Sequence, residues 1–215
     1  MGQTREGSER PLQQIAIAFS ELATHIKSQH QLKHDEQENN VLVASFAGAS
    51  SHVSVLFGCL GIAFKFAERD YVAKVHDLTK VASNIPTLQS LLEFDLERDS
   101  VKVRGSHSRN LLRVKRGLDM VRVLFQGILN SNEESLRDCA SQAYAEVFAP
   151  HHSFPIRAAV TAGFYALPTR SQLMNKLNED EISARELMQE YITAVDPVIN
   201  YVEGIFLSRG LGIDW

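Results

Sequence analysis

Apolar residues recur every three or four positions along most of this chain, which is the spacing of an amphipathic helix. The first such stretch begins at Pro11, a residue suited to a first helical turn, and extends to about residue 30. Its apolar face consists of Leu12, Ile15, Phe19, Leu22 and Ile26. The polar run over 29–40 then predicts a loop.

The same spacing predicts further helices, over about 41–66, 68–82, 87–99, 106–130, 135–149, 155–167, 169–177 and 179–208. Ser106 is expected to cap the long helix that follows it, Thr169 or Ser171 the short one, and acidic residues open the last one. Pro197 favours a kink in that last helix. Because no alternating strand pattern and no Asn-Gly or Asp-Gly turn is found, the fold class is predicted to be all-α.

The most apolar stretch, 53–64, is interrupted by Ser54, Gly58 and Gly61. It is shorter than the roughly 20 apolar residues that a membrane-spanning helix needs. The stretch is therefore predicted to be core rather than a membrane anchor.

Composition narrows the function further. The 215 residues are 44% hydrophobic and 22% charged, which suits one domain over 11–215 after a disordered segment at 1–10. A net charge of −4 argues against nucleic acid as a partner. Two cysteines, Cys59 and Cys139, are too few for a disulfide scaffold. With no signal-peptide pattern at the start, we expect a cytoplasmic protein.

The stretch 105–130 has two different faces. One is an apolar stripe that ends at Ile128, and the other carries Arg109, Arg113 and Arg116 within roughly 60° of one another before turning apolar. A helix face that carries guanidinium groups and then becomes apolar suits an amphiphile, because the guanidinium groups can bind an anionic head and the apolar part can bind a tail. The alternative is a solvated arginine face, which on periodicity alone is the commoner case.

Other candidate sites are weaker. Asp70 and Lys74 are four residues apart, and an exposed pair at this spacing is worth about 0.3–0.5 kcal/mol. His151 and His152 are adjacent and do not face one site, so no metal is expected. The sequence contains no Gly-x-Ser-x-Gly elbow and no phosphate-binding Gly-x-x-x-x-Gly-Lys loop, and Cys59 has apolar neighbours. We expect no catalytic residues, no cofactor and no enzyme.

Several segments together resemble the glycolipid-transfer-protein family, and most closely its plant branch of accelerated-cell-death type ceramide-1-phosphate transfer proteins. The matching segments span roughly nine tenths of the chain. Its most specific pieces are LFGCLGIAFKF at 56–66, DYVAK at 70–74, RNLLRVKRGL at 109–118, FAPHH at 148–152, YALPTR at 165–170 and LGIDW at 211–215. The resemblance implies a two-layer helical sandwich that encloses an apolar cavity for lipid chains.

It also implies roles for five residues. Asp70 matches the aspartate that bonds the ceramide amide and hydroxyl, and His152 the histidine that donates to the ceramide carbonyl. Lys74 and Arg113 stand where sugar-binding members have an asparagine and a tryptophan, and Arg109 completes a phosphate-binding pattern. Arg116 and His151, the neighbours of this set, are not part of that pattern. The expected ligand is ceramide-1-phosphate or a related phosphosphingolipid.

One departure concerns membrane contact. The family often has Gly-Trp after the pocket histidine, and here the residues are Ser153 and Phe154. Phe154 and Ile156 are the expected contacts of a monomeric carrier that touches membranes reversibly from the cytoplasmic side. Three other functions are weighed against this one: a lipid sensor or adaptor that signals to a protein partner, a helical enzyme that acts on sphingolipids, and a structural scaffold without a lipid.

Overall fold

The computed structural model describes residues 10–31 and 40–215, apart from the side chains of 29–31. Within these ranges the chain forms helices and two isolated β-bridges, with no strand, so the all-α prediction is confirmed. The elements are α1 (Pro11–Gln31), α2 (Val43–Leu60), η1 (Ile62–Phe64), α3 (Lys65–Val81), α4 (Leu88–Leu96), α5 (His107–Asn130), α6 (Arg137–Val147), η2 (Ala149–His151), α7 (Phe154–Gly163), η3 (Phe164–Ala166), α8 (Arg170–Leu177) and α9 (Glu181–Leu207).

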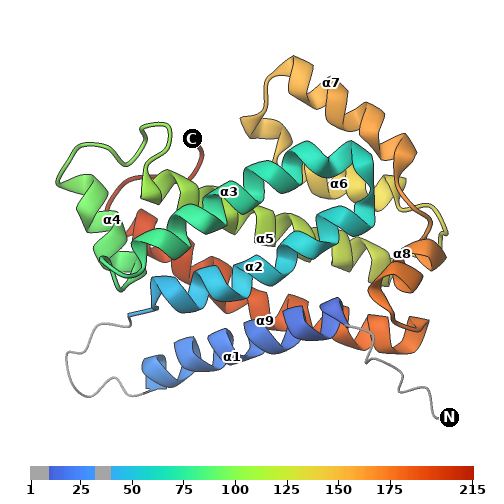
Figure 1. Ribbon diagram of the computed structural model, residues 1–215, viewed down its shortest axis with the longest axis horizontal. Coiled ribbons are helices and arrows are strands. Elements are labelled where there is room, and N and C mark those ends of the chain that lie inside the picture. The colour runs from blue at the N-terminus through green and yellow to red at the C-terminus, as the bar shows by residue number, and fades with distance from the viewer. Residues whose placement is uncertain (1–9, 32–39) are drawn as a thin grey trace, which may run out of the picture.

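The long helices lie in two layers. Figure 1 shows α1, α2 and α3 in front, with α9, α5 and α6 behind them, and α7 projecting from one edge. The packing pairs agree with this view, because α1 packs against α9 and α3 against α5, while α2 packs beside α3 and α5 beside both α6 and α9. The arrangement leaves α5 in contact with both layers, as expected for a helix that is apolar on two faces.

The core joins the two layers through Tyr191 of α9, which is fully buried. Its ring makes edge-to-face contacts with Phe19 of α1 and Phe125 of α5, at centroid distances of 5.2 and 5.5 Å. Its hydroxyl donates to the main-chain oxygen of Leu118, at 3.0 Å. A buried tyrosine needs such a partner, and this bond fixes α9 against the middle of α5.

Three predicted helix starts are confirmed. Ser106 Oγ accepts a hydrogen bond from the main-chain N–H of Arg109, and Asp180 caps α9 in the same way. Of the two residues weighed for the short helix α8, Thr169 is the cap and forms a capping box with Gln172. Pro197 lies inside α9.

The predicted helix over 41–66 is wrong at its end. The chain turns at Gly61, which has φ +103°, and η1 separates α2 from α3. Only glycine adopts this backbone conformation readily. The prediction that 53–64 is core is also wrong in part, because Ile62, just past the turn, is 88% exposed and Val55 is 44% exposed.

By length and composition alone, α2 is one helix of the described chain that could cross a membrane. Core helices pass the same test, and Val53 and Leu56 of α2 are buried in the core. The expected disordered segment at 1–10 falls almost wholly outside the described residues, as does most of the predicted loop over 29–40. A single domain over 11–215 stays a prediction.

Candidate functional site

The packing of α3 against α5 decides which polar side chains meet. Gly117 of α5 lies against the ring of Tyr71 of α3, and a methyl group at Gly117 would come within 2.6 and 2.8 Å of two ring carbons. Farther along α3, Asp77 Oδ2 accepts a hydrogen bond from Asn110 Nδ2, at 2.8 Å. Residue numbers rise along α3 as they fall along α5, so the two helices run antiparallel and the turns midway between these contacts face each other.

Lys74 lies on that turn of α3. It forms an ion pair with Asp70, and its ammonium also donates to the main-chain oxygen of Asp70, at 3.1 Å. The surface ion pair weighed in the sequence is therefore present, since residues four apart lie on the same helix face. Lys74 is largely buried, but the Asp70 side chain is 63% exposed and keeps its second oxygen open to another donor.

Arg113 lies on the facing turn of α5. It makes no hydrogen bond and no ion pair with any part of the chain that the structure describes, so its guanidinium is available to an anion. Arg109, one turn earlier, donates to the main-chain oxygen of Lys102, at 2.5 Å. That bond uses one of its donors and leaves the others to a ligand.

Arg116 has a different role. It is buried, and its guanidinium donates to the main-chain oxygens of Ile213 and Trp215, at 2.6 and 2.7 Å. Burial, followed by the charge of Arg113, lowers its pKa to about 10, while Asp214 acts in the opposite direction. Arg116 therefore stays charged at neutral pH and holds the C-terminal segment against α5.

His152 follows η2 and completes the group. Its ring stacks on Phe148 at a centroid distance of 5.4 Å, and its Nδ1 lies 2.9 Å from the hydroxyl of Tyr144. Burial, followed by the charge of Arg113, lowers the pKa of His152, and Asp70 raises it. Because both charges act on the imidazole, Asp70 and Arg113 lie in the neighbourhood of His152, although the three residues come from three separate elements.

His151 shares Arg116 with His152 but differs in its other neighbours. Burial and the charge of Arg116 lower its pKa, and Asp214 raises it. The adjacent histidines therefore have different surroundings. No group of three or more His, Cys, Asp or Glu side chains in the described ranges is arranged to hold a metal ion.

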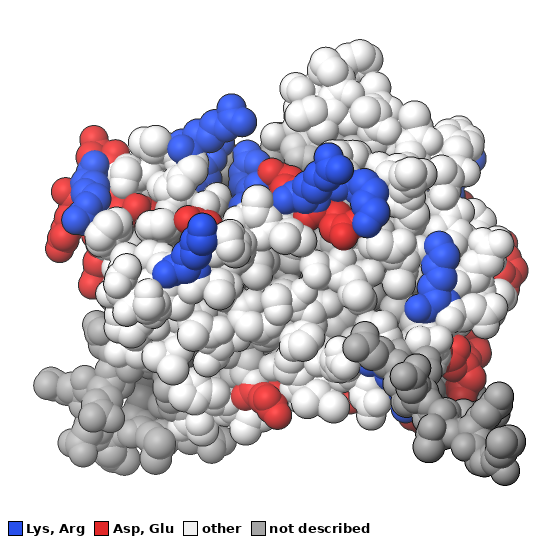
Figure 2. All heavy atoms as spheres, viewed as in Figure 1, with Lys and Arg blue, Asp and Glu red and all other residues white. Residues whose placement is uncertain are grey.

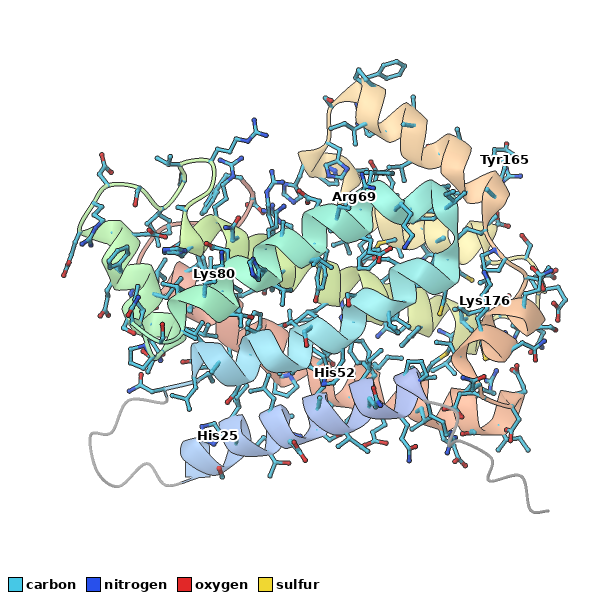
Figure 3. The ribbon with its side chains drawn as sticks, in the orientation of Figure 1. His25, His52, Arg69, Lys80, Tyr165 and Lys176 are labelled. Carbon is cyan, nitrogen blue, oxygen red and sulfur yellow. The ribbon has the colours of Figure 1, made fainter. Side chains whose placement is uncertain are left out.

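The five predicted headgroup residues thus lie on α3, on α5 and after η2, and their placement is consistent with one site. The two predicted membrane contacts are on α7, where Phe154 is 75% exposed and Ile156 is 42% exposed. In Figure 2, lysine and arginine side chains gather along the upper edge of the molecule, above α3 and beside α7. A separate hollow, lined by residues that include His25 of α1 and His52 of α2, lies away from this edge (Figure 3).

The sequence did not reveal two features of the site. Tyr144 is a buried aromatic residue on α6, and nothing in its spacing distinguishes it from an ordinary core residue. The contact of Arg116 with the C-terminal segment joins residues almost 100 positions apart, which no local pattern reports.

Comparison with known proteins identifies the family. The model of the family described as "Glycolipid transfer protein (GLTP)" matches residues 41–179. The protein called "Accelerated cell death 11" of Arabidopsis thaliana is 52% identical over 209 residues, which are 97% of this chain and 98% of that relative. This chain belongs to the glycolipid transfer protein family. A ceramide-1-phosphate transfer protein of Danio rerio is 32% identical over 71% of this chain and 78% of its own length.

Solved structures confirm the glycolipid-transfer-protein fold. A crystal structure of a variant of the Arabidopsis accelerated-cell-death protein, complexed with a ceramide-1-phosphate, superposes with a TM-score of 0.90 at 51% identity, and covers 97% of this chain and 100% of that one. The apo form of mouse ceramide-1-phosphate transfer protein gives a TM-score of 0.78 at 23% identity, over 93% and 97% of the two chains. At that identity the mouse protein supports the fold alone.

Proposed function

We propose that this protein binds one ceramide-1-phosphate, or a close phosphosphingolipid, and carries it between membrane surfaces without chemistry. Lys74, Arg109 and Arg113 hold the phosphate. Asp70 accepts hydrogen bonds from the amide and hydroxyl of the ceramide, and His152 donates to the acyl carbonyl. The roles of Asp70 and His152 follow from the family resemblance.

The meeting of Asp70, Arg113 and His152 at one place is the observation that carries this proposal. A phosphosphingolipid presents an anion next to an amide. The site places Arg113, which has no ion pair among the described residues, near an imidazole and near a carboxylate that pairs with Lys74. The accelerated-cell-death protein of Arabidopsis is 52% identical over nearly the whole length, and the crystal structure of a variant of it contains ceramide-1-phosphate, which supports the same ligand here.

The charges of the site favour a phosphate over a sugar. A phosphate monoester carries between one and two negative charges near neutral pH. Charge-assisted hydrogen bonds contribute about 1.5–3 kcal/mol each. Lys74, Arg109 and Arg113 offer three cations against the single carboxylate of Asp70, which already pairs with Lys74. A neutral sugar head would leave the excess positive charge without a partner.

Transfer needs no reactive group. The lipid leaves the apolar interior of a bilayer for an apolar protein interior, so the large free energy of about 0.8 kcal/mol per buried methylene largely cancels between the two states. Because the free energies of the lipid in the bilayer and in the protein are then similar, both uptake and release are possible. Membership of a lipid-transfer family supports a carrier rather than an enzyme.

Contact with the membrane is assigned to α7. Residues 153–159 are exposed on every face of the first two helical turns, and they include Phe154 and Ile156. An apolar helix start that projects from the molecule can enter the interfacial region of a bilayer while the rest stays in water. We propose that a monomer makes this contact reversibly, from the cytoplasmic side.

Transfer of fluorescent ceramide-1-phosphate between vesicles, beside a galactosylceramide with the same chains, tests the proposal. We expect fast transfer of the phosphate lipid and little transfer of the sugar lipid. Arg113→Ala removes a cation that has no ion pair in the described part of the chain, and it should slow phosphate-lipid transfer at least about tenfold, from the loss of charge-assisted contacts.

Arg185→Ala is the matched control, because Arg185 of α9 donates to Leu129 near the other end of α5. It should transfer ceramide-1-phosphate like the wild type. Equal transfer of both lipids, or an Arg113→Ala protein that works as well as the control, would contradict the headgroup assignment. Tight binding of ceramide-1-phosphate with negligible transfer would contradict the carrier role.

A further inference from the structure

Tyr144 of α6 touches the proposed ceramide-binding histidine through its hydroxyl. The tyrosine is buried between the ring of Phe164, in an edge-to-face contact at 5.9 Å, and the ring of His152, at 5.7 Å. Its hydroxyl oxygen lies 2.9 Å from His152 Nδ1. Phe148 covers one face of the same imidazole, so the ring of His152 is held on two sides.

The direction of this hydrogen bond follows from what surrounds it. The hydroxyl proton of a buried tyrosine needs an acceptor, and His152 Nδ1 is the one acceptor that the described residues offer to it. If Nδ1 carried the proton instead, the hydroxyl would accept that bond and its own proton would have no protein partner. Tyr144 therefore donates, and Nδ1 accepts.

Burial, followed by the charge of Arg113, lowers the pKa of His152 and so favours the neutral imidazole at pH 7.5. Asp70 acts in the opposite direction, and Arg116 adds to the lowering. Burial raises the pKa of the Tyr144 hydroxyl, and the charge of Arg157 acts in the opposite direction. A neutral imidazole has one N–H and one lone pair. With Nδ1 as the acceptor, the proton is on Nε2, the nitrogen that has no hydrogen bond within the described part of the chain.

We propose that Tyr144 is a positioning residue that fixes His152 in the Nε2–H tautomer, so that the site always presents an N–H donor to the acyl carbonyl of its lipid. This proposal rests on the function proposed above. It adds a specificity device, because the opposite tautomer would point a nitrogen lone pair at the carbonyl oxygen and repel it. With Asp70 as acceptor and His152 as donor, the two side chains match both polar atoms of a secondary amide.

The tautomer can be measured directly on the full chain, without lipid. Two-bond proton–nitrogen correlation NMR distinguishes Nδ1–H, Nε2–H and imidazolium forms, and loss of a signal in His152→Gln assigns the residue. We expect Nε2–H in the wild type at pH 7.5, and in Tyr144→Phe a mixture with the Nδ1–H form. Tyr165→Phe, which changes an exposed ring on η3 (Figure 3), should leave the signal unchanged.

An Nδ1–H or imidazolium signal in the wild type, or an unchanged tautomer in Tyr144→Phe, would overturn the proposal. This result does not depend on which lipid the protein carries. It therefore stays informative if the proposed function fails.

The lipid readout compares two phosphate lipids. Ceramide-1-phosphate has an acyl carbonyl, and sphingosine-1-phosphate has the phosphate but no acyl carbonyl. Tyr144→Phe should weaken binding of ceramide-1-phosphate about three- to tenfold, the value of one hydrogen bond, and should not change binding of sphingosine-1-phosphate. Equal weakening of both lipids would show a structural role and contradict the proposal.

A second variant separates tautomer control from packing. The side-chain amide of glutamine always carries N–H donors, so a His152→Gln protein does not need Tyr144 to supply one. In that background, adding Tyr144→Phe should have no further effect on ceramide-1-phosphate binding. A further loss as large as in the wild type would mean that Tyr144 acts through packing.

Discussion

His151 and His152 lie in surroundings that disfavour their charged forms. Burial and nearby arginines lower the pKa of both side chains below the ordinary value of 6.5. In the unfolded chain these histidines take up protons at a higher pH than in the folded protein. Stability that is present above pH 6.5 is therefore lost as pH falls toward the folded pKa values.

We expect the free energy of unfolding, measured with urea, to fall between pH 7.5 and pH 5.5. His152→Gln should flatten that decrease, because its side chain does not titrate. His25→Gln is a control on α1, outside the site. A wild-type free energy of unfolding that rises over this interval, or the same slope in His152→Gln, would show that the surroundings of His152 do not disfavour its charge.

At the level of single residues, the sequence predicted where charged groups lie better than it predicted which groups they bind. The spacing placed Arg109, Arg113 and Arg116 on one helix face, and all three lie in the same region. It could not show that Arg116 donates to the C-terminal segment while Arg113 has no hydrogen bond or ion pair within 10–31 and 40–215. That difference depends on tertiary contacts, which leave no mark on a helical repeat.

The spacing of α3 and α5 depends on one glycine. Gly117 leaves the space that the ring of Tyr71 fills, and a methyl group there would overlap two ring carbons. Gly117→Ala should push the helices apart and lower the free energy of unfolding by about 1–3 kcal/mol, the usual cost of overpacking. It should also weaken ceramide-1-phosphate binding, since Lys74 and Arg113 are on the two displaced helices.

Gly204→Ala provides the contrast. This glycine lies inside α9 and a methyl group there would meet nothing within 4 Å. The change should raise the free energy of unfolding by up to about 1 kcal/mol through helix propensity. Chemical denaturation of both variants checks the pair. Equal effects would mean that the Tyr71 contact does not set the helix spacing.

Most helices could be read from the sequence, and the exceptions have a local cause. Ser106, Thr169 and Asp180 each carry a side-chain oxygen suited to a cap, so those starts were predictable. Gly61 was not recognised as a break. Gly48 and Gly58 lie inside α2 and do not interrupt it, so glycine alone could not predict where the helix ends.

On the scale of the molecule, exposed apolar side chains occur at the start of α7 and in η1, near its end. A methyl group added at Gly163, at the end of α7, would lie 3.6 Å from Ala63 Cβ of η1, so the end of α7 is close to η1, where the neighbouring Ile62 is exposed. Phe154→Ser should reduce binding to vesicles of neutral phospholipid about tenfold or more, by removing one exposed aromatic side chain from the contact.

Ile182→Ser is a matched control for this change. Ile182 lies on α9 and is 73% exposed, close to the 75% of Phe154. It should leave vesicle binding unchanged in a co-sedimentation assay, and neither variant should alter the tautomer of His152. If both variants bind vesicles equally well, another face of the molecule meets the membrane.

The way in which the C-terminal segment packs gives the protein a built-in optical reporter. The sequence has a single tryptophan, Trp215, whose indole donates to the main-chain oxygens of Leu211 and Gly212 and lies 5.5 Å from the ammonium of Lys102. Its main-chain oxygen accepts a hydrogen bond from Arg116, on the helix that carries the arginines proposed to bind phosphate. Since α7, the proposed docking helix, carries phenylalanine and no tryptophan, tryptophan emission comes from the C-terminal segment beside the proposed headgroup site. Ligand uptake at that site can therefore be followed by tryptophan emission without a dye and without a signal from α7.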